Sequence, residues 1–136
     1  MSQASQSPPS ELFMKVRRWI LEAFTAGGAE VDMGTKLYTT FLGAGLSPPS
    51  MVATTPVVCG PTANGYEYMV RILRSLLPLI ERNGLASIAE IGVDTLAARL
   101  RDDALASERV AFLPRIVGAW ARRSLDDAGI GSSDRL

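Results

Sequence analysis

The alternation of apolar and polar positions predicts that most of this chain is helical. A first amphipathic helix begins at Glu11, where Ser10 is placed to cap it, and ends at Gly27-Gly28. Its apolar side chains recur every three or four residues and form one stripe, which comprises Leu12, Phe13, Val16, Trp19, Ile20, Ala23 and Phe24. A second helix is predicted from Asp32 to about Leu42.

Three further helices are predicted in the second half of the chain. The longest begins at Tyr66 and closes at Asn83-Gly84. Pro78 is expected to kink or split it, because proline removes one hydrogen bond and clashes with the preceding turn. Ser87–Glu90 fits a capping box for a short helix, and Asp94 is placed to cap the last one.

Two segments have the composition of strands. Met51–Cys59 is rich in β-branched residues, and Pro56 suggests an edge or a bulge because it lacks an N–H. In Arg109–Trp120 both sets of alternate residues are nearly all apolar. A strand with this pattern belongs in the interior of a sheet that is covered on both faces.

The predicted fold class is therefore α+β, with about five helices and a two-stranded antiparallel ribbon. A ribbon of two strands has marginal stability in water by itself. The apolar pattern of its second strand nevertheless predicts that both faces of that strand are covered. Three arrangements resolve this conflict and stay open. The helices wrap the pair completely, another polypeptide supplies a larger sheet, or two copies pair edge to edge.

The length of 136 residues argues for one domain. We expect a disordered lead-in over 1–9, a single partial domain over 10–123 and a flexible tail over 124–136. The N-terminus lacks the pattern of a signal peptide, and no apolar run approaches the roughly 20 residues of a membrane span. Together with a single cysteine, Cys59, these features predict a soluble, cytoplasmic protein.

Charge and residue types exclude several classes of function. The 14 basic residues balance the 14 acidic ones, which disfavours a general nucleic-acid binder. The chain has no histidine, the commonest general base and metal ligand, so we expect no metal site. The glycine-rich nucleotide motifs and the histidine-based zinc motif are also missing.

The residues that suggest chemistry have structural explanations that we favour. Cys59 has no histidine partner and is expected to be a small buried residue. Gly43-Ala44-Gly45 closes a helix, whereas a dinucleotide fingerprint opens one. Asp102 and Asp103 are helical neighbours about 100° apart, so they form a solvated face and no paired site. Trp19 is expected in the core rather than stacked on a ligand.

Several short motifs follow one another over about residues 8–123. Asp32–Leu46 carries the pattern MG..L...F..AGL, Ser75-Leu76-Leu77-Pro78 and Gly84-Leu85 come later, and the segment Val117–Arg122 ends the series. In this order the motifs resemble the second half of a class I S-adenosylmethionine-dependent methyltransferase. The resemblance implies the C-terminal, substrate-side half of a Rossmann-like fold, in which the two strands are the antiparallel edge pair of a seven-stranded sheet.

This resemblance also implies S-adenosylmethionine-dependent methyl transfer to a small molecule. It makes Phe13, Arg17 and Met33 plausible pocket-lining positions, by their placement alone. The family's glycine-rich turn and acidic ribose ligand precede everything matched here, so we assign no catalytic or cofactor-binding residue. The chain is therefore expected to be inactive alone, with a separate N-terminal half or a second copy as its partner.

Two other functions stay open. One is a non-enzymatic interaction module that dimerises through its apolar faces. The other is an independent small enzyme, which we rate lowest because acid and base residues are missing. The size of the particle in solution tests these hypotheses, because a well-behaved monomer would weaken both the half-enzyme and the dimer hypotheses.

Overall fold

The structure is a computed structural model of the chain, and it describes residues 4–122. The predicted tail over 124–136 lies outside the described residues. The fold is α+β, as predicted, with four helices of eleven residues or more, one four-residue helix and two small antiparallel sheets in the described range. None of the described helices is both long enough and apolar enough to span a bilayer.

The chain divides into two compact units. One, called here the helical unit, comprises Met1–Val31 and Thr55–Arg115. The other, called the strand unit, comprises Asp32–Thr54 and Ile116–Leu136. The range 10–123, expected as a single domain, is thus shared between two units, and each is described separately below.

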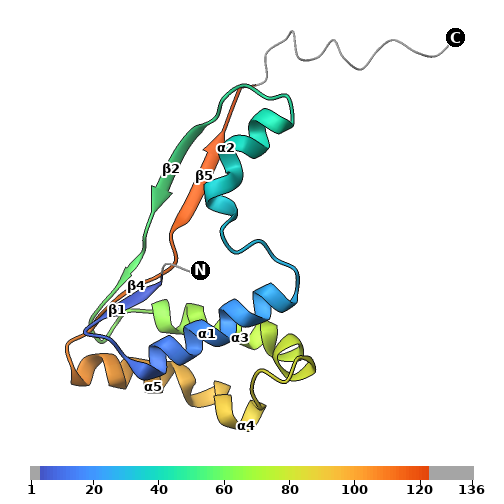
Figure 1. The fold of residues 1–136 in the computed structure, drawn as a ribbon. Coiled ribbons are helices and arrows are strands. Elements are labelled where there is room, and N and C mark those ends of the chain that lie inside the picture. Colours follow the sequence, from blue (N-terminus) through green and yellow to red (C-terminus); the bar gives the residue numbers. More distant parts are fainter. Residues whose placement is uncertain (1–3, 123–136) are drawn as a thin grey trace, which may run out of the picture. The chain divides into compact units, whose positions relative to one another are not determined.

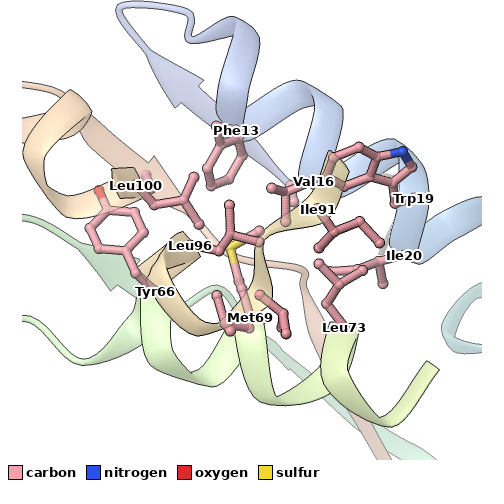
Figure 2. Close-up of a cluster of buried hydrophobic side chains, with 14 of the residues drawn as sticks. Phe13, Val16, Trp19, Ile20, Tyr66, Met69, Leu73, Ile91, Leu96 and Leu100 are labelled. Carbon is pink, nitrogen blue, oxygen red and sulfur yellow. The ribbon is translucent and has the colours of Figure 1, made fainter. Parts of the chain in front are cut away.

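The helical unit is built on α1 (Glu11–Ala26), α3 (Gly65–Arg82) and α5 (Val93–Ala106), with the short α4 (Ile88–Ile91) before α5 (Figure 1). Helix α3 packs against both α1 and α5. The predicted stripe of α1 faces this core and supplies five of its buried side chains, namely Phe13, Val16, Trp19, Ile20 and Ala23. Figure 2 shows Phe13, Val16, Trp19 and Ile20 of α1 beside labelled side chains of α3, α4 and α5.

The predicted helix boundaries agree with the structure to within one or two residues, but the prediction that Asp94 caps the last helix is wrong, because Gly92 is the N-cap and Asp94 lies in the first turn. The Ser10 hydroxyl accepts a hydrogen bond from the Phe13 N–H, and so caps α1 as predicted. Helix α3 continues through Pro78, so the prediction that this proline splits the helix is wrong. Pro78 is exposed, which lets the ring lie at the surface, away from the core.

A three-stranded antiparallel sheet completes the helical unit. Its strands are β1 (Ser5–Ser7), β3 (Val57–Val58) and β4 (Val110–Phe112), in the order β1-β4-β3. Strand β1 corrects the expected disordered lead-in, because Gln6 pairs with Ala111 and is buried. The polar composition of this segment concealed a strand that is held by backbone pairing.

The strand unit contains α2 (Met33–Gly43), β2 (Ser50–Thr54) and β5 (Ile116–Trp120) (Figure 1). Strands β2 and β5 pair antiparallel over five residues, with Val52 opposite Gly118. The predicted ribbon therefore exists, but each of its strands is interrupted. The interruptions coincide with Pro56 and Pro114, which have no N–H to donate to a ladder.

Within the strand unit, the apolar strand β5 is not enclosed. Ile116 is 57% exposed and Trp120 is 55% exposed, and no residue of β2 or α2 is buried. Within this unit the ribbon is therefore not wrapped by α2. All three arrangements, in which the chain's other helices, a larger sheet or a second copy covers the ribbon, remain predictions.

Candidate functional site

The three predicted pocket residues are divided between the two units, with Phe13 and Arg17 in the helical unit and Met33 in the strand unit. Phe13 is fully buried in the core of the helical unit, so no substrate reaches its ring in this structure. Arg17 lies one turn later on α1 and is half-buried. Met33 belongs to the strand unit, where it is exposed at the start of α2. Arg17 lines a hollow on α1.

This hollow lies on the outer side of α1 and has a volume of ≈ 610 Å³. It is lined by Glu11, Met14, Lys15, Arg17, Arg18, Leu21 and Glu22. Within it, the Lys15 ammonium lies 2.7 Å from a Glu90 carboxylate oxygen and 5.1 Å from the centre of the Trp19 ring. The hydrogen bond from Lys15, and then its charge, hold the pKa of Glu90 below its usual value. The lining of the hollow comes from helix α1 alone, and the Lys15 ammonium within it is already paired with Glu90.

A polar network joins the beginning of α1 to the end of α5. The Ser10 hydroxyl donates to Asp103 Oδ2 over 2.5 Å, and Asp103 Oδ1 lies 2.8 Å from Arg109 Nη1. Arg109 Nη1 also donates to the main-chain oxygen of Asp103 over 2.7 Å. The sequence placed Asp103 on a solvated face, and the structure corrects this because the carboxylate is held between two partners. The Ser10–Asp103 hydrogen bond joins residues 93 positions apart, which no local pattern signals.

A second polar contact lies between β1 and α3. The Gln6 side-chain amide donates to the Tyr66 hydroxyl over 3.4 Å, and both side chains are buried. Burial raises the pKa of Tyr66 above its ordinary value, because the phenolate would lose its hydration. The hydroxyl therefore stays neutral and anchors β1 to the helix. The contacts of these two networks hold elements of the helical unit together, and we assign them a structural role.

The described residues do not fit S-adenosylmethionine. The one glycine-containing loop that leads from a strand into a long helix connects β3 to α3, across Cys59–Asn64. Gly65 at its end is packed directly against the Val58 side chain, so the space that its missing side chain leaves is already filled. Strand β3 is also antiparallel to its neighbour, unlike the strand of a dinucleotide cradle. We therefore derive no catalytic step through this cofactor.

Cys59 lies in the same loop and is exposed with a free thiol, which corrects the expectation of a buried residue. Trp19 is buried, as predicted. The described residues contain no group of three or more potential metal-ligating side chains close enough to hold an ion.

The most distinctive surface of the chain is the β2–β5 ladder of the strand unit. Residues directly opposite in an antiparallel pair share a face. One face carries Val117, and α2 packs on it so closely that a Cβ on Gly34 would lie 2.7 Å from Val117 Cγ2. The other face, called here the open face, comprises Ser50, Val52, Thr54, Ile116, Gly118 and Trp120.

The open face is apolar and exposed. Val52, Ile116 and Trp120 are each more than half exposed, and none of the ten ladder residues carries a charge. Among the described residues, neither β2 nor β5 has a second strand beside it, so each presents an edge of free backbone groups. An apolar face beside open edges is typical of a surface that another β-strand covers. The ladder is thus the candidate functional site, as an interface.

Comparisons of the chain with models of protein families, with curated proteins and with solved structures found no match.

Proposed function

We propose that this chain is the substrate-side half of a class I S-adenosylmethionine-dependent methyltransferase that acts on a small molecule. In this proposal the cofactor is held by residues outside the described chain, and the β2–β5 ladder is the antiparallel edge pair of a larger sheet. The chain alone is then inactive.

One observation carries the proposal: the antiparallel ladder is uncharged, is mostly apolar on both faces and is not enclosed within the strand unit. In an isolated two-stranded ribbon the open face would be in contact with water. Polar side chains would be expected there, because exposure of apolar side chains to water is unfavourable. The same pattern is expected for a strand that lies inside a wider sheet with layers on both faces. The order of the motifs from Asp32–Leu46 to Val117–Arg122 supports the methyltransferase assignment.

The experiment begins with the DNA immediately before the Met1 codon. We expect a reading frame that encodes a strand followed by a glycine-rich turn. That product and this chain are expressed together and separately, and S-adenosylmethionine is titrated into each by calorimetry. The pair is expected to bind it, and this chain alone is expected to give no binding heat. An intact pair that does not bind, binding by this chain alone, or the absence of such a reading frame contradicts the proposal.

The second candidate function is a non-enzymatic dimerising module. It is favoured by the free edges of the ladder, which serve a second copy as well as another protein.

A further inference from the structure

We infer that the free edge of β5 is a self-recognition site, at which a second copy of this chain adds its own β5 in antiparallel register about Gly118. The inference concerns assembly of the chain alone, and it does not depend on the proposed methyl transfer.

Strand β5 is self-complementary in sequence. A twofold axis at Gly118 places Ile116 of one copy opposite Trp120 of the other, and Val117 opposite Ala119. The first pair joins an aromatic and a β-branched side chain, a combination that stabilises antiparallel neighbours. No charged residue lies opposite a like charge, because none of the five positions is charged.

Gly118 leaves space on the open face of the ladder. This residue has no side chain between Ile116 and Trp120 on the open face, and a Cβ built there would meet only Val52 Cγ1, at 3.5 Å. Pairing about Gly118 gathers two isoleucines and two tryptophans around two glycines. Ile116 and Trp120, which are 57% and 55% exposed in one copy, thereby gain apolar neighbours.

The flanking residues distinguish β5 from β2. Strand β2 has prolines on both sides, at Pro48-Pro49 and Pro56, whereas β5 has one nearby, Pro114, and β2 also begins and ends with a polar residue, Ser50 and Thr54. Prolines beside an edge strand limit its extension by a further strand, because they donate no hydrogen bond. The described edge of β5 is apolar throughout, so it is the edge that a second copy occupies.

Pairing at one five-residue edge buries little surface, so the dimer is expected to be in equilibrium with the monomer. Cross-linking detects such an equilibrium. The native thiol is first removed as Cys59→Ser, and Gly118→Cys is introduced into that variant. The matched control is Val52→Cys, which is opposite Gly118 on the same open face but belongs to β2. In the inferred dimer the two copies of position 52 are three strand spacings apart, about 14 Å.

The two variants are treated with a short bismaleimide at several protein concentrations. Gly118→Cys is expected to give covalent dimer at least tenfold faster than Val52→Cys, and sedimentation equilibrium of the unmodified chain is expected to show a mass that rises from 14.6 kDa toward twice that value. Equal rates for the two variants, faster reaction at position 52, or no dimer in either measurement overturns the inference. Neither readout involves S-adenosylmethionine, so failure here is distinct from failure of the proposed function.

Discussion

The two units of this chain differ in how far they bury their apolar side chains. In the helical unit, the sheet edge at β4 is covered by β1, and the amphipathic helices bury their apolar stripes against one another. In the strand unit, the ladder has two strands, one helix, and no fully buried side chain among the described residues. Apolar composition alone therefore does not make a core, because a core also needs enough layers of helices and strands to exclude water.

The first prediction sets the core of one unit against the open face of the other. Phe13→Ala is expected to lower the free energy of unfolding by about 3–5 kcal/mol, because it leaves a cavity in a closed core. Trp120→Ala removes a larger side chain and is expected to cost less than about 1 kcal/mol, because that ring is more than half exposed. Urea denaturation of both variants measures the difference, and equal losses would show that the open face is buried after all.

The second prediction concerns close packing of a strand on a helix. Gly65→Ala is expected to cost about 1–3 kcal/mol, because its Cβ collides with the Val58 side chain. Gly43→Ala in α2 is the control, since nothing lies within 4 Å of its Cβ, and it is expected to leave stability unchanged or to raise it slightly. The double variant Gly65→Ala, Val58→Ala should recover part of the loss. A neutral Gly65→Ala would contradict the packing described here.

The same comparison explains what the sequence predicted and what it did not. Helix ends depend on local chemistry, and the Ser10 cap was therefore predictable from neighbouring residues. The strand β1 was not, because Ser5–Ser7 is polar and is held by pairing with a segment more than a hundred positions away. The role of Asp103 was missed for the same reason.

The candidate interface was partly predictable. The double-sided apolar pattern of the last strand indicated that the ladder lacks a partner, and the exposure of Ile116 and Trp120 agrees with this. The pocket assignment by placement was less informative, because Phe13 belongs to the core and Met33 to the other unit. Spacing along a helix defines a face, and it does not say whether that face meets a substrate or a neighbouring helix.

The third prediction tests the anchor at the start of the helical unit. Ser10→Ala removes both the cap of α1 and the hydrogen bond to Asp103, and is expected to cost about 1–2 kcal/mol. Ser87→Ala is the matched control, because its hydroxyl caps the short α4 at an exposed position and is expected to cost less than about 1 kcal/mol. Thermal unfolding of the two variants compares them. A larger loss for Ser87→Ala would refute the importance of the Ser10–Asp103 contact.

The fourth prediction is the smallest effect and concerns pH. Burial raises the pKa of Tyr66 above its ordinary value of 10.0, so the folded state holds this proton more tightly than the unfolded state. The resulting stabilisation is complete below the unfolded pKa and is lost as pH rises through the folded pKa. The free energy of unfolding should therefore fall more steeply above pH 10.0 in the native chain than in Tyr66→Phe. Parallel pH profiles for the two proteins would show that Tyr66 ionises freely.

The most direct test of the contrast between the two units is native-state hydrogen exchange of the chain by itself, at a concentration low enough to keep it monomeric. The account predicts that the amides of Met69–Ile80 in α3 exchange slowest and that those of Val117–Trp120 in β5 exchange at least a hundredfold faster. Equal protection of the two segments would mean that the ladder is closed within one molecule, and would contradict the account.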